Sequence, residues 1–351
     1  MQSQHWQAEL PIAVVGGGLL GRLLAWRLLR AGWRVQLWEK DPEHSPGGAA
    51  WTAAGMVSPL SELAVSHLGL YQLGMSSLDL WPQWLAELGA EDCWQAPGTL
   101  VLAHGQDRPL LTQFEQQLRY HLPHWRSPWL NAEQIQQRDS GVQGRALVGM
   151  HLEGEAYIDG PRLMAHLLRA LRQLGAELHF SSPIEGELSL ARLAPAQAIF
   201  DCRGRGAQLD GLRGVRGELM RVHCPAVRLQ HALRLMHPRY LIYVVPRPEQ
   251  QFIIGASEIE SEDRSAMSLR TMLELGTALY SINPAFAEAR VLQLDTNLRP
   301  AMLHNDPILR HQQGVWQLNG LYRHGYLLAP AWLQQLAELL PSIEGDYEHR
   351  I

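Results

Sequence analysis

The sequence is poor in cysteine and carries no long run of charge of one sign. Its three cysteines, Cys93, Cys202 and Cys224, are scattered over 351 residues and form no C-x-x-C pair. A chain of this length does not need disulfides, so we expect a reducing, cytoplasmic compartment. The formal net charge of -5 gives neither nucleic acid nor an anionic membrane an electrostatic reason to bind. We therefore expect no nucleic-acid partner.

Uninterrupted hydrophobic runs and metal-ligand spacings are also missing. The most apolar stretch, near the N-terminus, is broken by Arg22, Arg27 and Arg30, which argues against a signal peptide and against an integral membrane segment. The sixteen histidines form no H-E-x-x-H or similar ligand spacing, so we expect no metal. What the chain does have is 46% hydrophobic residues, typical of a globular protein with a sizeable core, and enough length for about two domains.

Glycine is plentiful, and three glycines near the N-terminus form the most informative motif. The β-branched run Ile12–Val15 predicts a buried strand of a parallel sheet. Gly16, Gly18 and Gly21 follow at the spacing G-x-G-x-x-G, and leucines at helical spacing come next. One glycine permits the tight turn, one lets the backbone approach a pyrophosphate, and one lets the helix pack on the strand. The helix N-terminus then offers N–H groups to phosphate.

An acidic residue stands where a dinucleotide-binding motif requires one. A second apolar strand, Val35–Trp38, ends at Glu39, 23 residues after Gly16. A carboxylate at that point accepts hydrogen bonds from an adenosine ribose. The glycine spacing alone is weak evidence, but strand, glycines, helix, second strand and acid all occur here in the right order. The sequence therefore predicts a dinucleotide site.

The chain beyond this motif predicts two kinds of sheet. A capped helix from Asp159 to Leu174, the strand Ala176–Phe180 and the apolar strand near Ile199 suggest a return to the dinucleotide-binding sheet. From residue 213 on, strands follow one another with a single helix, 268–281, between them, which indicates a mostly antiparallel sheet. The strand candidates there are 217–223, 240–246, 251–256 and 290–298.

We therefore predict an α/β fold in which the dinucleotide-binding domain is discontinuous. Its pieces are residues 1–88, 155–212 and 300–351, and the inserted second domain comprises 89–154 and 213–299. The run Ser45–Met56 lies in the first piece, is rich in small residues and poor in charge, and is less polar than a free loop would be. We expect its backbone to lie against a flat ligand.

Several short motifs, taken together and in order, resemble one family. The sequence resembles the D-amino-acid-oxidase-like flavoproteins, and among them the glycine oxidase branch associated with thiamine biosynthesis. The resemblance covers nearly the whole chain. It rests on the glycine motif with Glu39 and on the segments Thr52–Met56, Arg216–Glu218, Tyr243–Arg247, Ile254–Ala256, Leu298–Pro300 and Gly320–Pro330.

The resemblance implies FAD, bound by a Rossmann-like domain of the glutathione-reductase type, with the substrate domain over the flavin. It also implies oxidation of glycine, a small D-amino acid or a secondary amine by hydride transfer to flavin N5, with a 2-oxo acid and ammonia as products. Oxygen or another carrier would be the acceptor, and homo-oligomers are expected by analogy. The implied cofactor contacts are Gly16, Gly18, Leu19, Leu20, Gly21, Glu39, Lys40, Thr52, Ala53, Ala54, Gly55, Met56, Ile184, Cys202, Gly204, Arg323, His324, Gly325, Tyr326, Leu327 and Leu328.

The resemblance assigns the substrate side to three residues. Arg299 falls on the family's carboxylate-binding arginine, Tyr243 on its substrate-side tyrosine, and Arg323 on the arginine of the C-terminal corner. A guanidinium can hold a carboxylate with two parallel hydrogen bonds. The α-hydrogen would leave as hydride from a neutral amine, so no dedicated base is required. Tyr240 is a further candidate for substrate contact, and His324 is read as a neighbour of the site without a catalytic role.

Two departures from the family pattern leave alternatives open. Glu258 stands where the pattern has an apolar residue. It would favour a second amino group on the substrate if it faces the site, and would have no role if it faces solvent. The segment 201–206 is also unusually polar. Two other functions share the fold: an amino-acid dehydrogenase that passes electrons to a quinone, and a flavoprotein that modifies the wobble uridine of tRNA. The negative net charge argues against the second.

Overall fold

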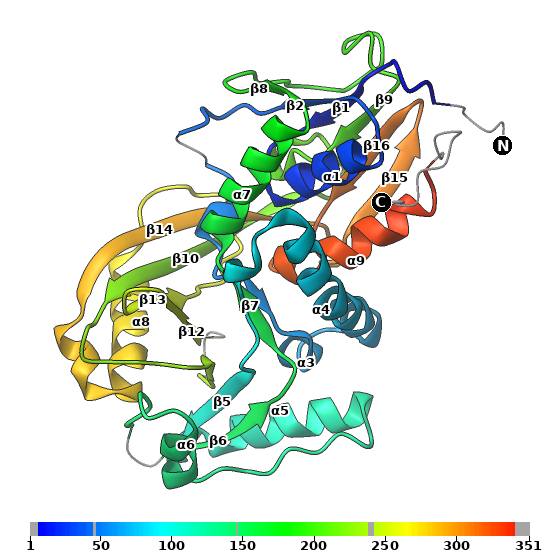
Figure 1. Cartoon of the computed structure of the whole chain (residues 1–351). Helices are drawn as coiled ribbons and strands as arrows, with labels where there is room; N and C mark the ends of the chain where they lie inside the picture. The colour runs from blue at the N-terminus through cyan, green and yellow to red at the C-terminus, as the bar shows by residue number, and fades with distance from the viewer. Residues whose placement is uncertain (1–5, 45–46, 145–146, 238–241, 341–351) are drawn as a thin grey trace.

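The computed structural model describes residues 6–44, 47–144, 147–237 and 242–340. Within these ranges the chain forms two large β-sheets and one small sheet, with helices packed around them (Figure 1). The predicted α/β class is confirmed. No helix in the described ranges is long and apolar enough to cross a membrane.

The first large sheet contains the predicted dinucleotide-binding strands. In spatial order, its described strands are β15 (Ile308–Gln312), β16 (Val315–Asn319), β9 (Ala198–Asp201), β1 (Ile12–Val15), β2 (Val35–Trp38) and β8 (Glu177–His179). β1 pairs in parallel with β2 and β9, and β8 and β16 extend the parallel arrangement. The expected return of the chain to this sheet after residue 175 is confirmed. β15, which we did not predict, pairs antiparallel with β16.

Four helices share an apolar core with this sheet. They are α1 (Leu19–Arg30), α4 (Leu68–Leu88), α7 (Gly160–Gln173) and α9 (Gly325–Ala337). α1 packs against α7 and α9, and α4 lies along α9 (Figure 1). Leucines and tryptophans of α1, α4 and α9 share one buried core.

One helical prediction is wrong in its details. The apolar spacing from Leu60 to Leu88 predicts one helix ended or kinked by Pro82, but the chain forms two helices, α3 (Pro59–Leu63) and α4. Pro82 lies inside α4, which continues to Leu88 and ends at Gly89 with φ of 64°. Ser58 starts α3 with Pro59 in its first turn, a position that needs no backbone N–H.

The second large sheet is mostly antiparallel, as predicted, although its two halves are joined by one parallel pair. In order, its described strands are β14 (Arg290–Ala301), β10 (Arg213–His223), β13 (Gln251–Gly255), β12 (Ile242–Arg247), β11 (Ala232–Leu235), β5 (Thr99–His104) and β6 (Leu147–Leu152). β11, which we did not predict, pairs in parallel with β5. Strands from 89–154 and 213–301 therefore share one sheet, and the proposed division into two domains remains a prediction.

The remaining described elements belong to neither large sheet. They are β3 (Met56–Val57), β7 (Ala156–Ile158) and β4 (Trp94–Gln95), which form the small sheet, α2 (Ala49–Thr52), α5 (Arg108–His121), α6 (Ala132–Arg138), α8 (Leu269–Ile282), and the 3₁₀ turns η1 (Glu91–Cys93), η2 (Gly105–Asp107), η3 (Gly204–Gly206) and η4 (Pro284–Glu288). α8 packs on β10, β12 and β13. Tyr240, the further candidate for substrate contact, lies outside the described residues.

Candidate active site

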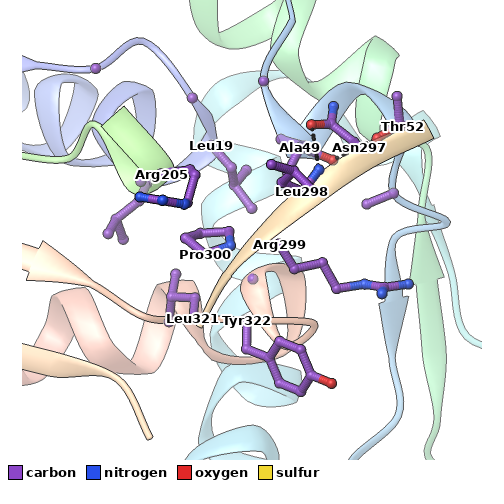
Figure 2. Close-up of a pocket in the computed structure, with 18 of the residues that line it drawn as sticks. Leu19, Ala49, Thr52, Arg205, Asn297, Leu298, Arg299, Pro300, Leu321 and Tyr322 are labelled. Atoms are coloured by element: carbon purple, nitrogen blue, oxygen red, sulfur yellow. Dashed lines mark hydrogen bonds between the residues drawn. The ribbon is translucent and has the colours of Figure 1, made fainter. Parts of the chain in front are cut away.

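A cavity of about 640 Å³ lies where the two large sheets meet. This volume is within the usual range for small-molecule sites, roughly 300–1,000 Å³. The loops after β1 and β2 contribute to its wall, as do α2, the C-terminal half of β14 and the segment 318–326. Figure 2 shows Asn297, Leu298, Arg299 and Pro300 of β14 at this cavity, with Tyr322 beside them.

The three motif glycines have different tasks. Gly16 has φ of +110°, and a side chain there would collide with the Cys202 carbonyl. A side chain at Gly21 would collide with the Gly16 carbonyl oxygen, so the first turn of α1 can approach β1 only through glycine. An added Cβ at Gly18 meets nothing within 4 Å, and Gly18 lines the cavity. Gly18 thus leaves the N-terminus of α1 open to a ligand.

Glu39 connects two loops at the wall of the cavity. Its Oε2 accepts a hydrogen bond from the Gly17 backbone N–H at 2.6 Å, and its Oε1 accepts one from the Asp41 N–H at 2.9 Å. Lys40 beside it also lines the cavity and pairs with Asp41 at 2.9 Å. The predicted acid therefore lies directly at the glycine loop.

Most of the other predicted cofactor contacts also line the cavity. These are Leu19, Leu20, Thr52, Ala53, Ala54, Gly55, Met56, Ile184, Cys202, Gly204, Arg323, Gly325 and Tyr326. Gly21, His324, Leu327 and Leu328 are not among the lining residues. Leu327 and Leu328 belong to the buried apolar core instead, because they lie on the face of α9 that packs inside the protein.

The charged side chains of the polar segment 201–206 form ion pairs within the protein. Arg203 pairs with Asp201 at 2.7 Å and donates to the Ile184 carbonyl at 2.7 Å, so it links β9 to the loop that carries Ile184. Arg205 pairs with Glu262 at 2.6 Å. Burial raises the pKa of the Cys202 thiol well above its ordinary value, so this cysteine stays protonated.

Arg299 and Tyr243 line the cavity from the second large sheet. Both terminal nitrogens of Arg299 donate to the Ser257 carbonyl at 3.1 Å, and Nη1 lies 3.4 Å from the Arg216 carbonyl. No described carboxylate lies within 4 Å of this guanidinium. Burial raises the pKa of Tyr243, although the nearby Arg299 charge opposes the rise, so its hydroxyl remains protonated near neutral pH.

Arg323 is held between two carboxylates, one of them Glu258. Its Nη2 lies 2.8 Å from Glu62 Oε2, and its Nη1 lies 3.0 Å from Glu258 Oε2. His324 Nε2 also contacts Glu62 Oε2 at 2.8 Å. Glu258 lines the cavity and has a side chain 45% exposed, so it reaches both the site and solvent. Its partners among the described residues include Arg323 and the Tyr322 hydroxyl, both of which line the cavity.

Glu62 makes the stability of this corner dependent on pH. Burial alone would raise its pKa, but the Arg323 charge and His324 hold the pKa of Glu62 well below its ordinary 4.5. A carboxylate with a depressed folded-state pKa stabilises the fold above its unfolded pKa, and that contribution is lost as pH falls below about 4.5. We expect Glu62→Gln to cost roughly 3 kcal/mol at pH 7, measured by denaturant unfolding, and to weaken the fall in stability between pH 5 and 3.

A matched control for Glu62 is available on the surface. Glu177 pairs with Arg34 at 3.3 Å, and the two side chains are 46% and 60% exposed. Because solvent screens such a pair, Glu177→Gln should cost less than about 1 kcal/mol. Equal losses of unfolding free energy in the two variants would show that Glu62 stabilises the protein no more than a surface ion pair does.

Sequence reasoning missed the residues that reach the site from distant segments. Glu62 and Ser61 lie on α3, and Arg234 lies on the unpredicted strand β11; all three line the cavity. Arg234 Nη1 donates to the Ser61 carbonyl at 2.7 Å, across 173 positions of sequence. No local sequence pattern predicts such a contact.

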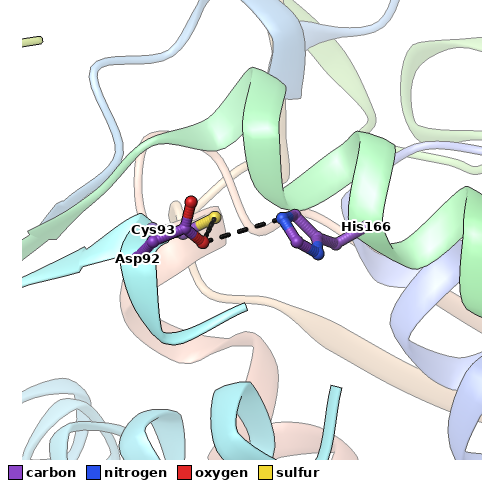
Figure 3. A group of neighbouring side chains, drawn as sticks. All are labelled: Asp92, Cys93 and His166. Carbon is purple, nitrogen blue, oxygen red and sulfur yellow. Dashed lines mark hydrogen bonds and ion pairs between the residues drawn. The ribbon is translucent and has the colours of Figure 1, made fainter. Parts of the chain in front are cut away.

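A second group of polar side chains lies away from the cavity, where Asp92, Cys93 and His166 approach one another (Figure 3). Asp92 pairs with Arg162 at 2.6 Å and lies 3.6 Å from His166 Nε2. Burial raises the pKa of the Cys93 thiol to about 12, and the thiol donates to Asp92 Oδ1 at 3.7 Å. The contacts of Asp92 with Arg162 and His166 account for the closeness of these side chains.

Comparison with known proteins gives one family. The model of the DAO family, described as FAD dependent oxidoreductase, matches residues 11–339. A Rhizobium etli protein described as a thiamine biosynthesis oxidoreductase, ThiO, is 34% identical over 341 residues, covering 97% of this chain and 99% of its own length. The glycine oxidase of Geobacillus kaustophilus is 25% identical over 367 residues, covering 96% of this chain and 94% of that protein.

Solved structures share the fold at lower identity. A glycine oxidase structure from Geobacillus kaustophilus superposes with a TM-score of 0.81 at 22% identity, covering 97% of both chains. Iminodiacetate oxidase from Chelativorans sp. BNC1 gives a TM-score of 0.78 at 24% identity, covering 96% of this chain and 97% of that one.

Proposed function

The chain belongs to the FAD dependent oxidoreductase family, and on that premise we propose that it oxidises the carbon–nitrogen bond of a small amino acid. Glycine is the first candidate, because glycine oxidases are among the relatives. Small D-amino acids and secondary amines belong to the same proposal. The observation that carries it is the Arg299 guanidinium, which lines the cavity and whose hydrogen bonds within the described residues go to backbone carbonyl oxygens.

The residues at the other end of the cavity fit FAD. Gly18 leaves the α1 N-terminus uncovered, where backbone N–H groups favour a pyrophosphate. Glu39 lies beside that loop with a carboxylate that could hold a ribose. The small residues from Ala53 to Met56 would let the flat ring approach the backbone closely. We propose these residues as the cofactor contacts.

Arg299 is proposed to bind the substrate carboxylate. Two parallel hydrogen bonds from its planar guanidinium would fix the position and the rotation of the substrate. The Tyr243 hydroxyl, kept protonated by burial, would add a donor on the same side. Arg323 is already engaged by Glu62 and Glu258, so we propose that it orders the corner near the ring and leaves the carboxylate to Arg299.

The chemistry follows from this positioning. Bound FAD supplies a two-electron oxidant that accepts a hydride equivalent from the α-carbon. The protein holds that carbon in place and binds the amine in its neutral form, and such positioning provides most of the rate enhancement. The resulting imine would add water to give a 2-oxo acid and ammonia, or a primary amine in place of ammonia when the substrate is a secondary amine. With oxygen as acceptor, hydrogen peroxide is the second product.

The test is an anaerobic visible spectrum before and after addition of glycine. We expect a yellow protein whose flavin absorbance is lost on adding glycine and recovers in air with release of peroxide. Recovery only with a quinone would make the protein a dehydrogenase. A yellow protein that neither glycine, sarcosine, D-alanine nor D-proline reduces would overturn the proposed substrate class.

The similarity to ThiO also supports a role in thiamine biosynthesis. Deleting the gene should then make growth depend on added thiazole or thiamine. Unchanged growth without thiamine, in a host with no second copy of the enzyme, would contradict this role.

The proposed ribose contact can be tested through FAD retention. We expect Glu39→Ala to weaken FAD binding by about 10- to 100-fold, because a charge-assisted pair of hydrogen bonds is lost. The same change removes the acceptor that ties Gly17 to β2. FAD content after extensive dialysis measures the effect, and full occupancy in the variant would argue against the contact.

A further inference from the structure

Arg234 lines the cavity, as Arg299 does, and both arginines belong to the large, mostly antiparallel sheet. It lies on β11 in register with Tyr243 of β12, which is in register with Gly255 of β13. Directly opposed residues on neighbouring strands share one face, with Cβ atoms about 4.5–5.5 Å apart. Arg234 and Tyr243 therefore stand side by side on the face that covers the cavity.

The Arg234 guanidinium is buried and has donors to spare. The residue is 5% exposed, and its Nη1 donates to the Ser61 carbonyl at 2.7 Å. Its Nε is buried with no hydrogen-bond partner in the described part of the chain. The guanidinium also lies 5.3 Å from the centre of the Phe114 ring. An unpaired donor on a buried charged group calls for an explanation, and a ligand in the adjoining cavity would provide one.

The nearby carboxylates are committed to other partners. Glu62 is held by Arg323 and His324. Glu155 accepts hydrogen bonds from the Ser61 N–H at 2.6 Å and from its hydroxyl at 3.0 Å, and burial raises the pKa of Glu155. No described carboxylate lies within 4 Å of Arg234. Among the described residues, Arg234 is thus a buried cation of the cavity without a direct anionic partner, as are the half-buried Arg299 and the exposed Arg264.

We propose that Arg234 binds a second carboxylate of the substrate while Arg299 binds the first. The substrate class is then an amino acid with an additional carboxylate, either on its side chain or on the amine nitrogen. This inference rests on the proposed function and narrows it. Arg234 is a specificity-determining residue beside Tyr243, and it takes no part in the bond changes.

The test compares matched substrates with the FAD-loaded enzyme. Iminodiacetate is paired with sarcosine, and D-aspartate with D-alanine, so that each pair differs by one carboxylate. We expect kcat/KM to be about 10- to 100-fold higher for at least one dicarboxylate than for its match, mainly through a lower KM, since a hydrogen bond to a charged group is worth about that factor. In Arg234→Met this ratio should fall toward one, and Arg234→Lys should retain part of it.

A binding measurement on the wild-type protein does not depend on how the variants fold. Malonate and succinate, which carry no amine, should perturb the flavin spectrum at concentrations about 10-fold lower than acetate and propionate. The absence of any dicarboxylate advantage in the wild type overturns the inference, and so does an advantage that survives in Arg234→Met. If no amino acid reduces the flavin at all, the proposed function itself is wrong.

Discussion

Replacing Gly21 with alanine is expected to give a destabilised protein that purifies without FAD. The added methyl group would collide with the Gly16 carbonyl oxygen, and the rigid turn after β1 leaves that oxygen no room to move. Overpacking of this kind typically costs about 1–3 kcal/mol or more. Because the same turn presents Gly18 to the ligand, we expect FAD binding to weaken by about 100-fold or more, roughly 3 kcal/mol. Thermal unfolding and flavin absorbance measure the two effects.

Gly18→Ala separates folding from cofactor binding. Gly18 has φ of -72°, which alanine adopts freely, and an added Cβ meets no protein atom within 4 Å. The variant should unfold within about 1 kcal/mol of the wild type when both lack FAD, yet bind FAD poorly because the methyl group enters the cavity. Gly276→Ala, in an open position inside α8, should keep full flavin content. Normal FAD binding by Gly18→Ala would move the cofactor away from this loop.

The glycine loop could be predicted because its geometry is local. Strand, turn, helix and Glu39 follow within one βαβ segment, and the contact from Gly17 to Glu39 spans only 22 positions. Each residue type is required by sterics or by a single hydrogen bond, so the pattern can be recognised in the amino-acid sequence. The parallel sheet and its returning strands were predictable for the same reason, since apolar strands and capped helices alternate there.

The partner Glu62 of the Arg323 corner could not be predicted, because it reaches the corner through long-range contacts. Glu62 and His324 are 262 positions apart, and nothing near Glu62 distinguishes it from a surface acid of a helix. Arg234 lies on a strand of four residues whose surroundings are rich in arginine and histidine, so the strand itself went unnoticed. Its partner strand β5 runs parallel from another part of the chain. The sheet, rather than any motif, brings Arg234 to the cavity.

Replacing Arg299 with alanine is expected to raise the KM for glycine by about 100-fold while FAD stays bound. The guanidinium would supply two charge-assisted hydrogen bonds to the substrate carboxylate, together worth about 3 kcal/mol. Since no described carboxylate pairs with it, its removal leaves no unpaired anion behind, and the fold should tolerate the change. Rates of anaerobic flavin reduction at increasing glycine concentration give the apparent affinity directly.

The shape of the guanidinium and its place on β14 provide the controls. Arg299→Lys keeps the charge but loses the planar fork, so an intermediate loss of about 10-fold is expected. Arg290→Ala removes an exposed arginine from the other end of the same strand and should leave the KM unchanged.

A KM unaffected in Arg299→Ala would assign carboxylate binding to another cation of the cavity. Arg234 would then be the first alternative, since it is buried on the same sheet beside Tyr243. The double variant Arg299→Ala with Arg234→Met would test that assignment, because losing both guanidinium groups should abolish saturation by any amino acid.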